Sequence, residues 1–284
     1  MRVGEEHVDL KARIGVDLGR ATPLEEALPW AAARGVRFLD VELDTGPNAL
    51  PRLDDARVAA IRAMIEAHDL RLGLHTLSAV NVAERSPYLS EAADAYLAAY
   101  IDLAPRLGAD WIVVHAGYHF TSDREARMRA GLERLKRATE RAERAGVTLL
   151  LENLNKEPPA AEVRYLAHTV EEWRFYYEAI PSPAFGLAFT ANHAHLMPEG
   201  VAGFLDAIPL SRVREVRLAD CWRHGDEVHL RPGEGDFDFG DLFRRLEGAG
   251  FAGHYMNAFG SLDDMERARG HLVRCAQEAG GPAG

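Results

Sequence analysis

The sequence is poor in cysteine and has no long apolar run, and both shortages narrow the classes of protein to consider. Cys221 and Cys275 are the only cysteines among 284 residues, too few for a disulfide framework and not spaced like a zinc ribbon. A membrane span needs about 18 consecutive apolar residues, and no such run occurs. The charged stretch 1–11 also lacks the apolar segment of a signal peptide. We therefore expect a cytoplasmic protein with reduced thiols and no membrane partner.

Basic residues are also in short supply. The chain has 33 Lys and Arg against 44 Asp and Glu, a formal charge of -11. Binding to nucleic acid requires clustered basic residues that neutralise phosphates. We therefore expect no nucleic-acid partner and instead a small polyhydroxylated molecule as the substrate.

Short β-type runs alternate with longer segments of helical periodicity along the whole chain. The expected strands are 14–18, 38–43, 71–75, 111–115, 148–152, 185–189, 213–218 and 254–256, and the expected helices are 24–33, 54–68, 91–107, 125–145, 170–180, 201–207, 239–249 and 262–278. Eight such repeats predict an α/β protein, a closed (β/α)8 TIM barrel. We predict one domain over 1–284, with the barrel at about 12–278 and a frayed tail at 279–284.

Two further features favour the barrel over an open doubly wound sheet. Gly108 and Gly146 each stand directly before an expected strand, where a helix commonly ends on glycine. An open dinucleotide-binding sheet would carry a glycine-rich phosphate loop after its first strand, and 15–19 is not one.

Three apolar strands end in residues that can bind a cation. His75, His115 and Glu152 follow the runs Leu-Gly-Leu, Trp-Ile-Val-Val and Leu-Leu-Leu. The ends of parallel strands meet at one mouth of a barrel, and imidazole and carboxylate are good ligands for a divalent ion. The alternative is a set of hydrogen-bonded rim residues without a metal, although a buried carboxylate needs some partner.

Three motifs resemble the sugar phosphate isomerase/epimerase superfamily of xylose isomerase-like TIM barrels, which also includes apurinic endonuclease-type barrels. They are 151–153 (Leu-Glu-Asn), 186–187 leading to His-Ala-His at 193–195, and 233–239 (Gly-Glu-Gly-Asp-Phe-Asp-Phe). The resemblance extends from residue 14 to about residue 274. Members of the superfamily often form dimers or tetramers, so the resemblance leaves a homo-oligomer open.

The resemblance also implies an altered metal site. In the sugar epimerases, strands five to eight supply Glu, Asp, His and Glu to one divalent ion. Glu152 matches the first of these, whereas Thr190, Arg217 and Asn257 stand where the other three are expected. The usual epimerase mechanism, in which two carboxylates act on opposite faces of the substrate, is therefore not available in its usual form.

The endonuclease branch offers a different match. Its first metal site is matched by His75, His115 and Glu152, and its third by His193, Glu227 and His229. The central site is lost, and the Arg217 guanidinium would supply positive charge in its place and could pair with Glu152 or with an anionic substrate group.

Together the residues and the resemblance assign roles within one mouth of the barrel. The predicted metal ligands are His75, His115 and Glu152. We expect them to hold one divalent ion, with zinc and manganese as the preferred metals. The alternative is a site that has no cofactor. The predicted catalytic residues are Glu152, Arg217 and His193, and the predicted substrate contacts are Arg223, His229, Asn257, Thr190 and Trp222.

Three functions stay open on this basis. The first is an isomerase, epimerase or dehydratase (lyase) acting on a small sugar, keto-sugar or cyclitol. The second is an inactive or metal-free barrel that binds a ligand or a partner protein, which the replacement of three ligands favours. The third is a metal-dependent hydrolase or endonuclease, which the net negative charge opposes.

Overall fold

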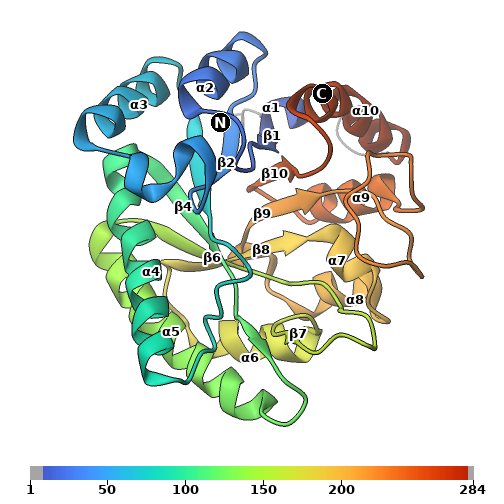
Figure 1. Cartoon of the computed structure of the whole chain (residues 1–284). Coiled ribbons are helices and arrows are strands. Elements are labelled where there is room, and N and C mark those ends of the chain that lie inside the picture. The colour runs from blue at the N-terminus through green and yellow to red at the C-terminus, as the bar shows by residue number, and fades with distance from the viewer. Residues whose placement is uncertain (1–8, 281–284) are drawn as a thin grey trace, which may run out of the picture.

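The computed structural model describes residues 9–280 and shows a closed barrel of eight parallel strands. Around the barrel the strand order is β1-β10-β9-β8-β6-β4-β3-β2 (Figure 1). The strands are β1 (Ile14–Asp17), β2 (Phe38–Glu42), β3 (Arg71–His75), β4 (Ala109–Val114), β6 (Thr148–Glu152), β8 (Phe185–Thr190), β9 (Val213–Leu218) and β10 (His254–Asn257). The predicted TIM barrel is confirmed.

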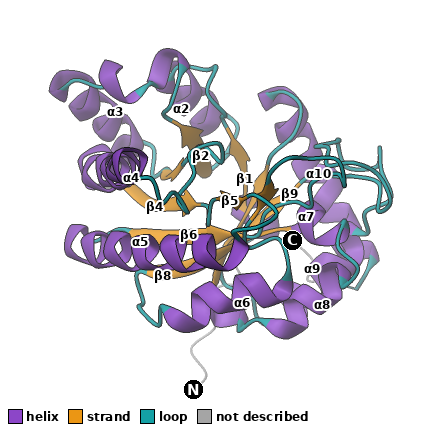
Figure 2. Cartoon of the chain, turned by 60° about the horizontal axis from the view of Figure 1, so that its bottom comes forward, coloured by secondary structure: helices purple, strands orange, loops and turns teal. Residues whose placement is uncertain are grey.

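Helices surround the sheet on its outer side, as Figures 1 and 2 show. The main helices are α2 (Leu24–Ala33), α3 (Asp55–Ala67), α4 (Pro87–Leu107), α5 (Arg124–Ala145), α6 (Val170–Ala179), α8 (Gly200–Ala207), α9 (Phe239–Gly248) and α10 (Leu262–Glu278). Shorter pieces are α1 (Leu10–Arg13), α7 (Ala191–His195) and the 3-10 turns Gly46–Asn48, Leu50–Arg52 and Leu210–Arg212. Gly108 and Gly146 end α4 and α5 with φ of 78° and 72°, as their positions predicted.

The strands separate two apolar regions. Outward-facing residues such as Ile14 and Val16 of β1 pack with the helices in the main core. Inside the barrel a smaller cluster forms a layer of its own, and it consists of Trp111, Val113, Leu150, Ala188 and Met256 with Phe38 packed against it. Alternate residues of a strand point to opposite faces of the sheet. The residues that also point into the barrel but lie closer to the carboxyl ends of the strands therefore surround the candidate site.

The barrel closes where the two ends of the described chain meet. β1 pairs with β10 in the register Ile14↔Tyr255. Arg269 of α10 is 1% exposed and donates to the backbone oxygens of Lys11, Arg34 and Gly35. One buried side chain thereby ties the last helix to the segments before β1 and β2.

A small second sheet lies beyond the strand ends and was not predicted. β5 (Tyr118–His119) and β7 (Arg164–Tyr165) pair antiparallel, joining the loops that follow β4 and β6. Each strand has two residues, too short for any periodicity to be recognised.

Two expectations concern the chain ends and the thiols. Of the predicted frayed tail, 281–284 lie outside the described residues, as do residues 1–8. Both cysteines are free.

Within residues 9–280, no helix combines the length and apolarity needed to cross a membrane.

Gly73 tests the packing of the barrel interior. A Cβ at this position would lie 2.1 Å from Trp111 Nε1 and 2.2 Å from Asp40 Oδ1, while at Gly248 it would meet nothing within 4 Å. We expect Gly73→Ala to lower the free energy of unfolding by about 1–3 kcal/mol through overpacking. Gly248→Ala, the control at the end of α9, should leave it unchanged or raise it by up to about 1 kcal/mol. Urea denaturation measures both, and equal stabilities would contradict the close packing described.

Candidate functional site

A cavity of about 710 Å³ opens at the carboxyl ends of the strands, where the sequence predicted the site. Its lining is rich in ionisable side chains. The carboxylates are Asp17, Glu42, Glu152, Glu157 and Glu227, the imidazoles are His75, His115, His193 and His229, and Arg217 is the guanidinium. Charged and polar groups that converge in one concave space are typical of an active site.

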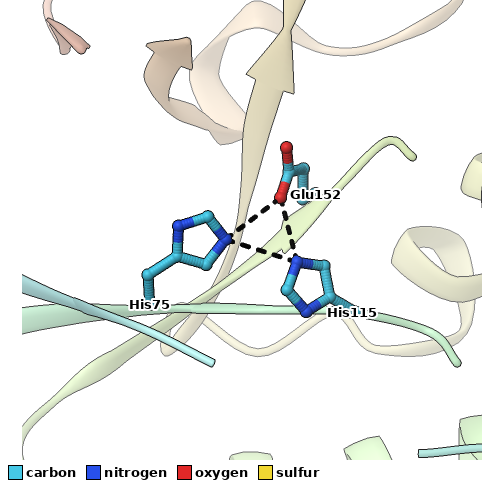
Figure 3. Close-up of side chains that lie close together, drawn as sticks. All are labelled: His75, His115 and Glu152. Carbon is cyan, nitrogen blue, oxygen red and sulfur yellow. Dashed lines mark hydrogen bonds and ion pairs between the residues drawn. The ribbon is translucent and has the colours of Figure 1, made fainter. Parts of the chain in front are cut away.

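His75, His115 and Glu152 meet in the arrangement predicted for metal ligands (Figure 3). Glu152 Oε2 lies 3.0 Å from His115 Nε2 and 3.4 Å from His75 Nε2, and the two nitrogens are 3.3 Å apart. Tetrahedral zinc with bonds of about 2.0–2.1 Å separates its ligand atoms by about 3.3 Å. The three side chains therefore have the spacing of one face of a tetrahedral cation site.

Hydrogen bonding fixes how His115 presents its ring. Thr76 Oγ1 donates to the Val113 carbonyl at 2.9 Å and lies 3.2 Å from His115 Nδ1. Since the hydroxyl proton is already committed, Thr76 accepts from Nδ1–H, and the neutral His115 ring turns an unprotonated Nε2 towards Glu152. A hydrogen bond that sets the tautomer in this way is typical of metal-binding histidines.

The two histidines of this group have opposite pKa shifts. Burial and Arg217 act to lower the pKa of His75, but hydrogen bonds with Asp17 and Glu152 outweigh them and raise it to about 10. Burial lowers the pKa of His115. Burial alone would raise the pKa of Glu152, yet the protonated His75 and the charge of Arg217 hold it well below its ordinary value. The proton on His75 thus supplies a positive charge among acceptor atoms that face one another. A bound cation would supply positive charge at the same place.

His193, Glu227 and His229 form a second group with its ligand atoms within 4.8 Å of one another. His229 Nε2 lies 2.7 Å and His193 Nε2 lies 3.7 Å from Glu227 Oε1. Each Nδ1 faces a backbone oxygen, that of Asn153 at 2.8 Å for His193 and that of Ala258 at 2.5 Å for His229. Hydrogen bonds with the two histidines hold the pKa of Glu227 well below its usual range.

Glu152 stands between the two groups. While its Oε2 faces His75 and His115, its Oε1 accepts from Thr190 Oγ1 at 2.5 Å and lies 3.7 Å from His193 Nδ1. Both oxygens of this buried carboxylate are therefore engaged, and its position is fixed from both sides.

Arg217 is the centre of an ion network directly below the cavity. Its Nη1 donates to Asp40 at 2.5 Å and to Glu215 at 2.7 Å, and its Nη2 donates to Asp17. Its Nε lies 4.0 Å from Glu152 Oε1. The side chain is 3% exposed, so much of its charge is balanced by the chain's own carboxylates.

Burial shapes the charges of this network as well. Although burial acts to raise the pKa of Asp17 and of Glu215, Arg217 lowers both. Burial and the neighbouring Glu215 raise the pKa of Asp40. A buried carboxylate is costly without a partner, and here three of them share one guanidinium.

The predicted substrate contacts separate into those at the cavity and those away from it. His229 and the predicted catalytic residue His193 line the cavity. Thr190 is 1% exposed and donates to Glu152, so it orients that carboxylate. Arg223 lines neighbouring surface hollows and approaches the backbone oxygens of His195 and Pro198, and Trp222 is 51% exposed outside the cavity.

The structure contradicts the prediction that Asn257 contacts the substrate. Inward positions of β10 are His254 and Met256, so Asn257 falls on the outer face of the barrel. Its side chain is fully buried against α10 and donates to the Met265 backbone oxygen at 2.9 Å. Asn257 therefore packs behind the strand and does not reach the cavity.

The Gly-Glu-Gly motif forms the loop that carries Glu227 and His229. Asp220, at the end of β9, accepts from the backbone nitrogens of Cys221, Gly233 and Phe237 at 2.8–3.0 Å. A Cβ on Gly235 would lie 2.3 Å from Asp220 Oδ1. Only glycine fits where this loop folds over the carboxylate.

Residues 27–272 match the family model described as the xylose isomerase-like TIM barrel. The chain belongs to this family. The resemblance seen in the sequence motifs is thereby confirmed. Comparison with curated protein sequences finds no significant match.

Solved structures share the fold of this xylose isomerase-like barrel. A D-tagatose 3-epimerase-like protein is 19% identical with a TM-score of 0.81, over 94% of this chain and 98% of that one. A D-psicose 3-epimerase from Clostridium cellulolyticum H10, with D-tagatose, is 15% identical with a TM-score of 0.77, over 95% and 100%. A 3-keto-D-glucoside 4-epimerase from E. coli is 16% identical with a TM-score of 0.72, over 93% and 99%. At these identities the likeness establishes the fold.

Four acidic residues of this barrel's site were missed from the sequence. Asp17 and Glu42 line the cavity from β1 and β2, while Asp40 and Glu215 bind Arg217 below it. Period-two alternation places Asp40 and Glu42 on one face of their strand, a signal that the sequence did contain.

Arg217 offers a direct test of the network. Replacing it by methionine leaves Asp17, Asp40 and Glu215 buried without their shared counter-charge, and loss of one partner of a buried ion pair costs about 3–5 kcal/mol. We expect Arg217→Met to lower the free energy of unfolding by that amount in urea denaturation. Arg214→Met, an exposed position on the same strand, should change it by less than about 0.5 kcal/mol. Equal stabilities of the two variants would show that the carboxylates do not depend on Arg217.

Proposed function

We propose that the chain is a metal-dependent isomerase or epimerase acting on a small sugar, keto-sugar or cyclitol. Dehydration of the same class of substrate is the chemically related alternative. The observation that carries the proposal is the pair of ligand-type groups on either side of Glu152 in one cavity of about 710 Å³. The similar structures of epimerases that act on ketoses and on a keto-glucoside support it.

The lining of the cavity suits a polyhydroxylated molecule. Carboxylates of Asp17, Glu42 and Glu157 accept hydrogen bonds from hydroxyl groups, while Asn155 and Ser78 offer neutral polar contacts. Tyr165, carried by the small sheet beyond the strand ends, adds an aromatic wall that can cover a ring.

The proposed resident cation is held by His75, His115 and Glu152. Their spacing and the tautomer of His115 fit zinc or manganese, and an ion there would polarise a substrate carbonyl or hydroxyl oxygen. The second group, His193, Glu227 and His229, offers equivalent donors. Arg217 takes the central place in this proposal, so the metal site is altered from the single-ion site of the sugar epimerases.

Glu152 and Glu42 have opposite pKa shifts, and we assign them different roles accordingly. Glu152 has a lowered pKa and stays ionised, which suits a ligand and orienting group. Burial raises the pKa of Glu42, which lines the cavity and lies 3.5 Å from Arg20 Nη1. A carboxylate tuned upward is the better proton acceptor, so we assign to Glu42 Oε the proton removed from the carbon beside the carbonyl.

Metal content tests the proposed cation site without a substrate. We expect protein purified without added metal or a His tag to hold at least one equivalent of a divalent ion by elemental analysis. His115→Ala removes one of three ligands and should lose that equivalent, whereas His68→Ala, an exposed position, should keep it. A second equivalent lost only in His229→Ala would place an ion at the second group. Wild-type protein that takes up no metal even on titration with zinc or manganese would refute the site.

Turnover tests the reaction class. On a panel of ketoses, keto-glycosides and inositol derivatives, we expect wild-type protein to interconvert at least one substrate, and Glu152→Gln to lower kcat by about 10²–10⁴-fold with the fold intact. A Gln of equal shape keeps the packing but loses the charge. An unchanged rate would remove Glu152 from the mechanism. Absence of turnover, with sugars still bound, would favour a ligand-binding barrel, and cleavage of an abasic-site duplex would favour the endonuclease hypothesis.

A further inference from the structure

A second cavity, of about 360 Å³, lies at the opposite end of the barrel, where the strands begin. Its inner wall is aromatic. Phe38 stacks on His254 with ring centroids 4.6 Å apart and an angle of 5° between the planes, and Trp111 lies 4.4 Å from the same imidazole. Trp111 and His254 are buried, whereas Phe38 keeps part of its surface open. The interior of the barrel is thus not fully sealed at this end.

The rim of this second cavity is basic although the chain as a whole is acidic. It is lined by Arg13, Arg37, Arg71 and Arg214 and by one carboxylate, Asp110, while Glu247 and Asp69 pair with two of the arginines from outside the lining. The arginines thus outnumber the carboxylates here, in a chain of formal charge -11. Such a local reversal of charge attracts anions.

The four guanidinium groups differ in how far they are already engaged. Arg13 is committed, since it donates to Glu247 and to the backbone oxygens of Gly253 and Phe251. Arg71 pairs with Asp110 at 2.6 Å with both side chains at least 40% exposed, and a pair of that kind is easily exchanged.

Arg37 and Arg214 have donors to spare. Arg37 pairs with the exposed Asp69 through Nη2, but its Nε is buried and finds no hydrogen-bond partner within residues 9–280. Arg214 has no ion-pair or hydrogen-bond partner among residues 9–280, the part of the chain that the structure describes. A buried donor without a partner is rare in a native protein and points to a missing acceptor.

We propose that this cavity binds a small planar aromatic anion, whose carboxylate or phosphate is held by Arg37 and Arg214 while its ring lies against Phe38. Arginine forks bind carboxylates and phosphates in a bidentate manner, and a flat ring stacks favourably on an aromatic side chain. The site is distinct from the cavity at the strand ends: the interior apolar cluster and the Arg217 network lie between the two, with Trp111 donating to Asp40 and His254 lying 3.0 Å from Glu215.

Calorimetric titration of the full-length protein tests the proposal with four probes. Benzoate and phenyl phosphate present the two anionic groups on a flat ring, cyclohexanecarboxylate has the charge without the planarity, and inorganic phosphate has the charge alone. We expect saturable binding of benzoate, phenyl phosphate or both, and binding at least about tenfold weaker for the other two probes. The stronger of the two aromatic anions identifies the anionic group that the site prefers.

Variants locate the binding. The double variant Arg37→Gln with Arg214→Gln removes the two available forks and should weaken binding about ten- to a hundredfold. Arg34→Gln is the matched control, since Arg34 is an exposed arginine before the same strand that does not line the cavity. It should bind as wild type does, and melting curves verify that all variants fold.

Four results would overturn the proposal. They are no saturable binding of either aromatic anion, equal binding of cyclohexanecarboxylate or of inorganic phosphate, equal loss in Arg34→Gln, and loss of binding in Glu152→Gln. The last would assign the ligand to the catalytic cavity.

Discussion

A single guanidinium, that of Arg217, balances three carboxylates inside the barrel, and the side chains above it are placed by that balance. Asp17 comes from β1, Asp40 from β2 and Glu215 from β9 itself, so the network joins strands that are far apart in the sequence. Charges buried this deeply are tolerated only as a complete set. Asp17 then faces His75, whose other nitrogen lies beside Glu152, so the order of the network extends into the cavity at the strand ends.

The fixed cation also limits the chemistry of the site. A guanidinium is permanently charged and cannot exchange, accept a proton or bind an oxygen as a metal does. The residues able to hold an exchangeable cation form two groups, one that includes Glu152 and one beside it.

The sequence predicted those parts of the structure that depend on local pattern. The eight strands follow from apolar runs, and His75, His115 and Glu152 were recognisable because each ends such a run with a residue that can bind a cation. The partners of Arg217 were not predicted, since Asp40 and Asp17 lie 177 and 200 residues away from it in the chain. Asn257 was misplaced because a shift of one residue along a strand turns a side chain to the other face of the sheet.

The seam of the barrel has a consequence for synthesis of the chain. β1 leaves the ribosome before the other strands of the barrel and β10 after them, yet the two must pair to close the sheet, and Arg269 then binds backbone oxygens that precede β1 and β2. Until β10 pairs with it, β1 has an unpaired edge. The carboxylate of Asp17 also has no ion-pair partner until Arg217 has been translated. Nascent chains of this protein therefore carry an open sheet until β10 has been translated, and this is the stage at which chaperones have most to protect.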